Sequence, residues 1–400
     1  MQGVDSLESS IRINAPAGGV SAAVPRKSRI LMVVDGFYPS TGGAEMQARL
    51  LSRSFAGAGH DVTVVVPRLD RSLPVHDTLD GVKVERIAYP KARLIGAVIL
   101  YLRFAALLWW RRRQYDAVHV HTAHFLAAVA GLVRPLTGKT LMVKVSGAWE
   151  FQGGVLDPLL RRRPLYRLTN WMLRRADHMH CISDYTRTML LEAGYADDQV
   201  CMIPNAVDLQ RFVPTRPPRI PPTVVFVGRL VPVKGLPVLL EAWKSVSAQV
   251  SARLVIAGDG PQRAELHQLA VKLGLADSIE FMGNVTDVPS VLAGASVYVQ
   301  PSYQEGMPNS VLEAMACALP VVATRVSGNI DLIDEGESGL LVPVSDPEAL
   351  AEALVGLLHA PERARAMGLR SRQIVEQRFA VPSVLQQLLA AYHRPRGVAR

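Results

Sequence analysis

Short strand-like segments alternate with helical segments along most of the chain, and this alternation limits the possible folds more than any other feature. In the first half, the expected strands cover residues 29–34, 62–66, 117–121, 141–145 and 178–182. Strands that are separated by helices pair in parallel through right-handed crossovers. The first half therefore predicts an α/β unit built on a parallel sheet.

A proline-rich segment separates this series from a second one. Residues 214–222 contain five prolines, which interrupt regular structure. The second series has expected strands at residues 223–227, 253–257, 279–282, 297–300 and 320–323. The chain of 400 residues also exceeds the size of one ordinary hydrophobic core. We therefore expect an α/β protein with two Rossmann-like domains, whose parallel sheets face a central cleft.

The expected domain boundaries follow from these two series. Residues 1–28 are mostly small or polar and predict a flexible extension without the apolar run of a signal peptide. Residues 29–213 and 214–379 form the two domains, and residues 380–400 include a last helix. In open α/β sheets, ligands lie beyond the carboxyl ends of the strands. Two such edges that face each other predict one substrate site in each domain.

One loop-to-helix junction in the second domain carries two acidic residues at a fixed distance. Pro308 suits the first position of a helix, because its missing N–H would have no partner there. Glu305 then precedes the helix, and Glu313 lies about one and a half turns inside it. The free amides at the helix start predict an anion site between the two carboxylates. This arrangement suits a sugar that is linked to a nucleotide through a diphosphate.

Two basic residues follow the first strand of the second domain. Arg229 and Lys234 lie in a glycine-containing loop that can approach a phosphate closely. Arginine offers a planar fork and lysine a point charge, so the pair can hold a diphosphate. On spacing alone, two ordinary surface cations are an equally good interpretation.

Five motifs in order resemble one enzyme family. They are residues 39–45 (PSTGGAE), 203–208 (IPNAVD), 228–235 (GRLVPVKG), 258–261 (GDGP) and 305–313 (EGMPNSVLE). The last resembles the E-x7-E signature of the retaining glycosyltransferases of family GT4, which have the GT-B architecture of two Rossmann-like domains. The resemblance extends from about residue 29 to about residue 380. It implies that the second domain holds a nucleotide-sugar donor and the first an acceptor, and that the last helix crosses back to the first domain.

The resemblance implies specific roles in donor binding. Arg229 and Lys234 grip the diphosphate and act with Glu305 in catalysis, where Glu305 contacts the hydroxyls of the donor sugar. Glu313 accepts hydrogen bonds from the two ribose hydroxyls, for which a carboxylate has enough acceptor oxygens. Further donor contacts are implied for Gly306, Met307, Asn309 and Val285, the last in a loop whose backbone reads the base. A solvent-exposed helical acid remains the plain alternative for Glu313.

In the first domain, the resemblance implies a catalytic role for one histidine. His121 is the second histidine of an H-x-H motif at the end of a strand, and a neutral imidazole there can hydrogen-bond a sugar hydroxyl. A structural histidine is the alternative. Gly42 and Gly43 open the first helix, and their amides are expected to meet a phosphate or the acceptor, with an ordinary turn as the alternative.

The chain departs from the family pattern at a few positions. Ser146 and Gly147 stand where many relatives have His-Gly, and Lys144 precedes them. This departure leaves the contacts to the acceptor open. Ala206 and Ala318 replace glycines of the family motifs, which are changes of packing or turn geometry and leave the expected donor site intact.

Other reactions and cofactors are less compatible with the sequence. The chain has no D-x-D motif, so a metal-bridged diphosphate is not expected, and no metal or other cofactor is predicted. No G-x-G-x-x-G follows a strand, which argues against a dehydrogenase. Two alternatives share the architecture: a nucleotide-sugar epimerase or hydrolase, and a non-catalytic sugar-nucleotide binding protein. Uridine is the commonest base in the family, so we expect a UDP-sugar.

A basic and apolar segment raises the question of a membrane. Residues 94–110 are almost wholly apolar except for Arg103, and Arg111–Arg113 follow at once. A buried helix is the preferred interpretation, followed by an interfacial helix and then by a membrane span. The net charge of +9 and a second run, Arg161–Arg163, favour an anionic membrane surface or substrate. No nucleic-acid recognition motif accompanies the charge.

The cysteines bear on the compartment. The three cysteines lie far apart and form no C-x-x-C, which is typical of a reducing compartment. We therefore expect a cytoplasmic protein, peripheral on the inner face of the cell membrane if the basic runs bind lipid. The acceptor then is a glycan, lipid-linked or small-molecule species.

Overall fold

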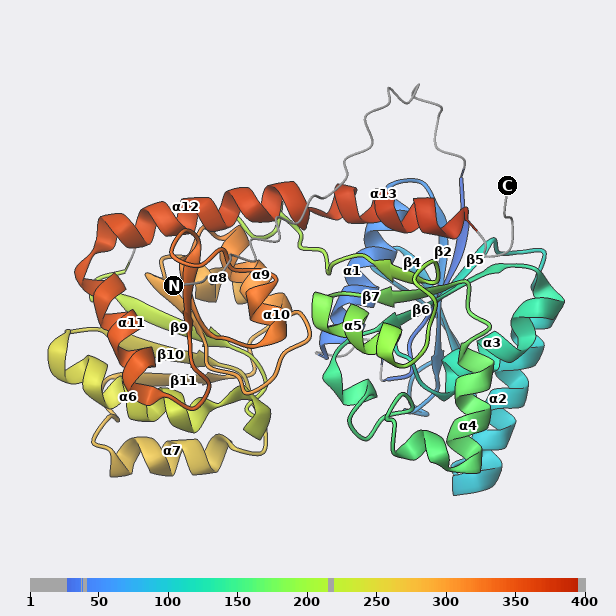
Figure 1. Cartoon of the computed structure of the whole chain (residues 1–400), viewed down its shortest axis with the longest axis horizontal. Helices are drawn as coiled ribbons and strands as arrows, with labels where there is room; N and C mark the ends of the chain where they lie inside the picture. The colour runs from blue at the N-terminus through green and yellow to red at the C-terminus, as the bar shows by residue number, and fades with distance from the viewer. Residues whose placement is uncertain (1–26, 37, 39–41, 215–218, 395–400) are drawn as a thin grey trace, which may run out of the picture.

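Two separate sheets, each covered by helices, make up the computed structural model, which describes residues 27–36, 38, 42–214 and 219–394 (Figure 1). The predicted extension up to residue 26, residues 39–41 of the first motif and residues 215–218 of the proline-rich segment lie outside the described residues.

The N-terminal sheet has eight strands in the order β3-β4-β2-β1-β5-β6-β7-β8. All neighbours are parallel except β3 and β4. The strands are β1 (Arg29–Val33), β2 (Asp61–Pro67), β3 (His76–Leu79), β4 (Val82–Ile87), β5 (Ala117–Val120), β6 (Thr140–Val145), β7 (His178–Cys181) and β8 (Val200–Met202). The helices are α1 (Gly43–Gly57), α2 (Arg93–Trp110), α3 (Phe125–Thr137), α4 (Pro164–Leu173) and α5 (Asp184–Glu192), with 3-10 turns η1 (Ala148–Glu150) and η2 (Leu160–Arg162).

The C-terminal sheet has six strands, all parallel, in the order β11-β10-β9-β12-β13-β14. They are β9 (Thr223–Val227), β10 (Arg253–Ala257), β11 (Ile279–Gly283), β12 (Val297–Gln300), β13 (Val321–Thr324) and β14 (Gly339–Val342). The helical segments after β8 are η3 (Pro232–Lys234), α6 (Leu236–Gln249), α7 (Arg263–Lys272), α8 (Val288–Leu292), α9 (Asn309–Ala316), α10 (Ser327–Ile330), α11 (Pro347–His359), α12 (Pro361–Arg378) and α13 (Val381–Tyr392), and α13 packs on the N-terminal domain. The predicted α/β class is confirmed.

Each sheet is buried on both faces, as expected for parallel strands. In the N-terminal domain, α2, α3 and α4 cover one face, and α1 covers the other. In the C-terminal domain, α6, α7 and α11 cover one face, while α8, α9 and α12 cover the other. The central strands are fully buried, and this explains why their sequences are continuously apolar.

The last two helices join the domains. Helix α12 packs on the C-terminal domain, and α13 continues along the same side of the molecule onto the N-terminal domain (Figure 1). Leu388 and Tyr392 of α13 are buried against α1 and the N-terminal sheet. The Tyr392 hydroxyl lies 2.8 Å from Nδ1 of His119 on β5. The C-terminal segment is therefore part of the first domain's core.

Helix α2, the apolar segment singled out in the sequence, has two different faces. Phe104 and Leu108 are buried in the core, whereas Leu94, Val98 and Leu102 are exposed on the other side. Among the described residues, no helix combines the length and apolar character that crossing a bilayer requires.

Candidate active site at the domain interface

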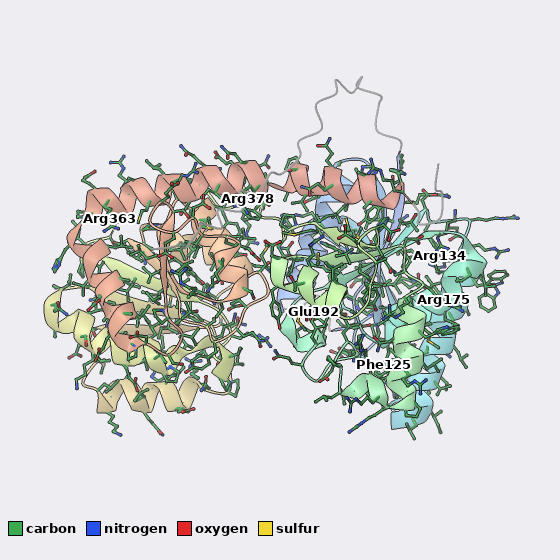
Figure 2. The ribbon with its side chains drawn as sticks, in the orientation of Figure 1. Phe125, Arg134, Arg175, Glu192, Arg363 and Arg378 are labelled. Carbon is green, nitrogen blue, oxygen red and sulfur yellow. The ribbon has the colours of Figure 1, made fainter. Side chains whose placement is uncertain are left out.

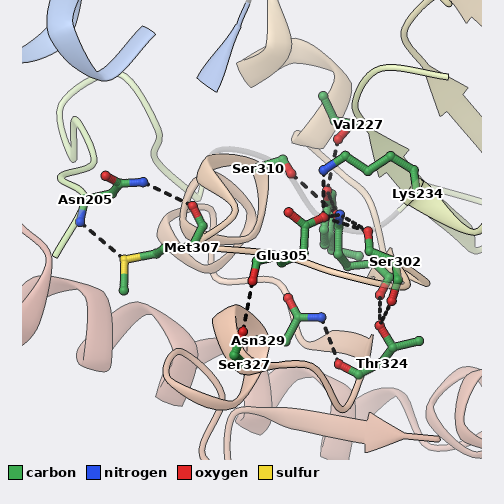
Figure 3. A network of polar contacts seen from close by, with 12 residues as sticks. Asn205, Val227, Lys234, Ser302, Glu305, Met307, Ser310, Thr324, Ser327 and Asn329 are labelled. Carbon is green, nitrogen blue, oxygen red and sulfur yellow. Dashed lines mark hydrogen bonds and ion pairs between the residues drawn. The ribbon is translucent and has the colours of Figure 1, made fainter. Parts of the chain in front are cut away.

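The loop between β12 and α9 holds Glu305 by a dense set of hydrogen bonds (Figure 3). One carboxylate oxygen, Oε1, accepts from three groups: Nζ of Lys234 at 2.6 Å, Nε2 of Gln300 at 2.7 Å and Oγ of Ser302 at 2.6 Å. Glu305 is only 9% exposed. The other oxygen, Oε2, has no partner within the described residues, so it can still accept hydrogen bonds from a ligand.

Further contacts fix the loop around this carboxylate. The Thr324 hydroxyl donates to the carbonyl of Ser302 at 2.5 Å, and the Ser327 hydroxyl donates to that of Glu305 at 3.0 Å (Figure 3). The buried Tyr298 hydroxyl donates to Oε1 of Gln300 at 2.8 Å. Because these donors come from β12, β13 and α10, the loop is positioned by the sheet itself.

Helix α9 starts directly after this loop. Within the described residues, the amides of Gly306, Met307, Asn309 and Ser310 donate to no protein acceptor, and they can therefore bind an anion. Pro308 lies at the N-cap with ψ 118°, one position before the predicted place, and this part of the prediction is wrong. Its carbonyl accepts from the amides of two residues of the first turn, so the helix begins at Asn309.

Glu313 lies one turn into α9 and is half-buried. Desolvation raises the pKa of its carboxyl to about 7, although the positive charge of Arg211 acts to lower this pKa. No described group donates a hydrogen bond to the Glu313 side chain. A carboxylate with unused acceptor oxygens can bind two adjacent hydroxyl groups.

Arg229 and Val285 lie on two loops beside this junction. The Arg229 side chain is exposed and forms no ion pair among the described residues. Its loop packs tightly against the glycine-rich turn after β10: a Cβ on Gly258 would lie 1.8 Å from the carbonyl oxygen of Gly228. Val285 is half-buried in the loop after β11, where Arg211 donates to the carbonyl of Thr286 at 3.5 Å.

The loop between β12 and α9 contacts the N-terminal domain through main-chain atoms. A Cβ on Gly306 would lie 2.2 Å from the carbonyl oxygen of Ser146 and 3.0 Å from Cα of Gly147. Only glycine fits such a close approach. The Ser146 hydroxyl in turn donates to the carbonyl of His121 at 3.2 Å. The predicted Gly306 and His121 are thus connected through the loop after β6.

A polar bridge also links the two domains. The amide oxygen of Asn309 accepts from Nε2 of Gln47 and from Nδ2 of Asn205, both at 3.0 Å. Nδ2 of Asn309 donates to the carbonyl of Gly43 at 3.1 Å. The start of α1 therefore faces the start of α9. The Asn309 side chain thus takes part in the contact between the domains, and its backbone amide has no protein acceptor in the described residues.

Asn205 connects the bridge to a buried lysine that sequence reasoning did not select. Nζ of Lys144 donates to Oδ1 of Asn205 at 2.7 Å. Figure 3 shows the backbone amide of Asn205 beside the sulfur of Met307, at 3.2 Å. Burial lowers the pKa of Lys144 to about 7, partly offset by the charge of Glu150. Glu150 accepts from the amides of Ser146 and Gly147. The only signal in the sequence was a lysine inside an otherwise apolar strand.

His121 lies beyond the end of β5 and is fully buried. It stacks on His119 with ring centroids 4.4 Å apart, and burial together with Lys144 and His180 lowers the pKa of His121 well below its ordinary value. The ring is therefore neutral. Nδ1 of His121 has no hydrogen-bond partner among the described residues.

Asp35 is a further residue that the sequence analysis did not select, and it lies at the same carboxyl edge of the N-terminal sheet as His121. Asp35 follows β1 and accepts from the Thr122 hydroxyl at 2.9 Å, while its Oδ1 is buried without a partner in the described chain. Desolvation raises the pKa of Asp35 to about 7, and the nearby Glu45 adds to this. The Glu45 carboxylate lies against Gly42, where a Cβ would meet it at 2.2 Å. No group of His, Cys, Asp and Glu in the described residues has the arrangement of a metal site.

Comparisons with known proteins agree with this geometry. The family described as Glycosyltransferase Family 4 matches residues 41–211, and the family described as Glycosyl transferases group 1 matches residues 221–360. D-inositol 3-phosphate glycosyltransferase 2 of Catenulispora acidiphila is 30% identical over 391 residues, covering 86% of this chain and 90% of that protein. The GDP-mannose-dependent alpha-(1-6)-phosphatidylinositol monomannoside mannosyltransferase of Mycobacterium tuberculosis is 28% identical over 369 residues, covering 87% and 94%. The crystal structure of Anabaena HepE in complex with UDP has a TM-score of 0.73 at 20% identity, covering 90% of this chain and 98% of HepE.

Two parallel-sheet domains that meet at the carboxyl ends of their strands define the GT-B class of glycosyltransferases. The predicted GT-B fold and transferase activity are confirmed. The chain belongs to glycosyltransferase family 4, also described as glycosyl transferases group 1.

Proposed function

We propose that this transferase moves a sugar from a nucleotide-diphosphate sugar to a glycan, lipid-linked or small-molecule acceptor, in polysaccharide or glycoconjugate biosynthesis. One observation carries the proposal: Lys234 is held beside Glu305, next to four backbone amides that have no protein acceptor in the described chain. A cation and convergent amides bind a diphosphate. In the chain, Glu305 precedes these amides and Glu313 follows them, and both carboxylates bind hydroxyl groups of the donor.

We propose a reaction that retains the configuration at the anomeric carbon. The acceptor oxygen attacks from the face that the diphosphate leaves, a new carbon–oxygen bond forms as the old one breaks, and the departing phosphate oxygen takes the acceptor's proton. Arg229 and Lys234 stabilise the negative charge that grows on the diphosphate, and this is the main electrostatic contribution. These side chains take the place of a metal ion, so no metal is expected to be needed.

A UDP-sugar is the proposed donor. The similar protein HepE has been crystallised with UDP, and Val285 lies in a loop next to Arg211 and thus on the same side as Glu313. Glu313 then accepts from the ribose hydroxyls. The unused Oε2 of Glu305 is available to a hydroxyl of the sugar, while Oε1 is held by Lys234.

The acceptor is proposed to be carried by a membrane lipid. The similar mycobacterial protein is named for a phosphatidylinositol monomannoside. The runs Arg111–Arg113 and Arg161–Arg163 lie on the N-terminal domain, which is the acceptor side in this proposal. We therefore place the enzyme at the inner, cytoplasmic surface of the cell membrane.

A thermal-shift screen with UDP-, GDP- and ADP-sugars tests the donor assignment. A ligand at ~100 times its dissociation constant stabilises a protein by about 2.7 kcal/mol. We expect the UDP-sugars to raise the melting temperature, with or without EDTA. GDP-mannose is the donor named for the mycobacterial relative. If GDP-mannose alone raises the melting temperature, the base of the donor is guanine and not uracil. No shift with any of the three nucleotides would overturn the assignment.

Two further measurements define the reaction. NMR of the product determines the anomeric configuration, and an inverted product would contradict retention. Donor incubated alone distinguishes transfer from hydrolysis or epimerisation, because only the latter two release free nucleotide or an altered sugar without an acceptor.

A further inference from the structure

Three neighbouring helices of the N-terminal domain, α2, α3 and α4, expose apolar side chains on one outer face of the molecule. Helix α3 packs between the other two (Figure 1). On α2, Leu94, Val98 and Leu102 follow one another at intervals of four residues, and they are 82%, 55% and 65% exposed. Residues four apart lie on the same face of a helix. The exposed residues therefore form a continuous apolar stripe, opposite the buried side of α2.

The stripe continues on the two other helices. On α3, Leu132 and Leu136 are exposed one turn apart, and on α4, Leu165, Leu168 and Trp171 are exposed. Single exposed apolar residues are ordinary, whereas a contiguous group on adjacent helices marks an interaction surface. We call the exposed residues of α2, α3 and α4 the apolar face.

Basic residues border the apolar face, and its three helices contain no acidic residue. Arg113, Arg162, Arg163 and Arg167 form no ion pair in the described part of the chain. By contrast, Arg111 of the first predicted run pairs with Glu85, so it is less available to a partner. The cations that border the apolar face can therefore meet an anionic partner.

Tryptophan–arginine pairs occur at the far ends of two of these helices. The guanidinium of Arg112 lies 4.0 Å from the ring centre of Trp109 on α2, and that of Arg175 lies 3.7 Å from the ring of Trp171 on α4. Arg175 and Arg134 lie on the same outer part of the domain (Figure 2). Tryptophan and arginine are both favoured at the level of lipid headgroups, where apolar and charged surroundings meet.

We propose that the apolar face lies in the surface of an anionic lipid bilayer, with α2 and α4 parallel to the membrane plane and the arginines at the level of the lipid phosphates. This combination of apolar area and surrounding positive charge is what interfacial helices use. A second copy of the chain is a poor occupant, because a symmetric contact would bring the same arginines face to face.

The position of the apolar face also suits the proposed reaction, and in this respect the inference rests on the proposed function. Helices α2 and α4 follow parallel strands, so they begin at the sheet edge that faces the C-terminal domain. The chain runs from Ser146 and Gly147, which contact Gly306 in the loop before α9, through the exposed Trp149 and Leu159 to Arg162. A lipid-borne acceptor therefore has a short path from the bilayer to the donor site.

Vesicle flotation with the full chain tests the proposal. The probes are vesicles of phosphatidylcholine alone and vesicles with added phosphatidylglycerol. We expect the protein to float with the anionic vesicles and to be released by high salt. Val98→Glu is expected to weaken binding at least about ten-fold, because it places an anion among the apolar contacts. Arg162→Glu with Arg163→Glu is expected to weaken binding at least about 25-fold, since each arginine near the surface contributes roughly five-fold.

Matched controls carry the same substitutions on the C-terminal domain. Val271→Glu changes a valine of α7 that is 69% exposed. Arg363→Glu with Arg365→Glu changes two exposed arginines of α12, of which Arg363 is labelled in Figure 2. Both controls should float like the unmodified protein. Equal loss in Val98→Glu and Val271→Glu, or no flotation of the unmodified protein, would overturn the proposal. The proposal would also be overturned if the unmodified protein forms a dimer without vesicles and Val98→Glu converts it to a monomer.

The assay contains neither sugar donor nor acceptor, so its outcome is independent of whether the chain transfers a sugar. The thermal shift by a UDP-sugar should be unchanged in Val98→Glu, which shows that the variant is folded. The double arginine variant provides a second test that leaves the apolar stripe in place.

Discussion

The two halves of the domain interface differ in how firmly hydrogen bonds hold their central side chains. On the C-terminal side, Oε1 of Glu305 accepts three hydrogen bonds, and its loop is held by donors from two strands and a helix. On the N-terminal side, Oδ1 of Asp35 and Nδ1 of His121 are buried without a hydrogen-bond partner among the described residues. An unsatisfied buried polar atom is costly, and native proteins keep it mainly where function needs it.

This difference suggests a division of tasks. The diphosphate and ribose are the same in every sugar linked to the same nucleotide, so a loop that hydrogen bonds hold in one position suits them. The acceptor is the variable partner. Unfilled acceptor and donor atoms such as those of Asp35 and His121 can select its hydroxyl groups, because a site with buried polar groups strongly rejects a ligand that leaves them unpaired.

The largest expected effect contrasts the two cations of the donor side. Lys234→Ala should lower kcat/KM by about 100- to 1000-fold, the usual loss when one charge-stabilising donor is removed. It should also lower the melting temperature, because Glu305 stays buried without its cation. Arg229→Ala should lose similar activity with an unchanged melting temperature, since its side chain is exposed.

Initial rates and thermal unfolding followed by circular dichroism measure both quantities. Lys272→Ala, at an exposed lysine of α7, is the control and should change neither. Near-normal turnover in Lys234→Ala or Arg229→Ala would show that the substituted residue does not act in catalysis. Equal destabilisation of the two variants would contradict the difference between Lys234, which pairs with Glu305, and Arg229, which forms no ion pair among the described residues.

An intermediate effect is expected where the two halves touch. Gly306→Ala places a Cβ 2.2 Å from the Ser146 carbonyl, so the domains must shift apart. We expect a destabilisation of about 1–3 kcal/mol and a loss of transfer activity larger than the loss of UDP-sugar affinity. Gly356→Ala is the control: a Cβ there meets nothing within 4 Å, and the helix should gain up to about 1 kcal/mol. Unchanged activity in Gly306→Ala would show that this approach is not needed.

The smallest effect concerns pH. Because burial raises the pKa of Glu313 to about 7, its carboxyl is mostly protonated at pH 6 and mostly ionised at pH 8. UDP-sugar affinity should therefore rise up to about ten-fold over this range if the ionised form accepts from the ribose. Glu313→Gln should remove the dependence. Calorimetric titration at several pH values measures it, and an identical pH profile in both proteins would contradict the role.

The same pKa shift affects folding with the opposite sign. The folded protein keeps a proton on Glu313 that the unfolded chain has already released above its ordinary pKa of 4.5. The stability of the unmodified protein relative to Glu313→Gln should therefore fall as the pH rises from about 4.5 to about 7. A difference that does not change with pH would indicate that Glu313 is not desolvated in solution.

Several site features could be predicted because they depend on short segments. Glu305, Gly306, Met307 and Asn309 lie in one loop, and the alternation of strands and helices places that loop at the carboxyl edge of a parallel sheet. The contact between Lys234 and Glu305 follows from two neighbouring loops at that edge. Strands β3, β4, β8 and β14 were not predicted. In β4, the charged Lys83 and Glu85 alternate with valines, so the segment resembles a polar connection.

Other features needed the packed molecule. Lys144, Asn205 and Gln47 come from three distant segments, and their sequences do not indicate that they meet. The predicted role of Asn309 as a donor ligand stays a prediction, and the sequence did not indicate that its side chain also bonds to the other domain.

The sequence by itself determined the α/β class, the family and the segments that carry the charged groups, because strand–helix alternation and motif spacing are local properties of a chain. Only the tertiary structure decided which groups remain unpaired and which apolar residues remain exposed. Helix α2 illustrates the reason: its composition is apolar on all sides, so one half could be assigned to the core and the other to the surface only once its neighbours were in place.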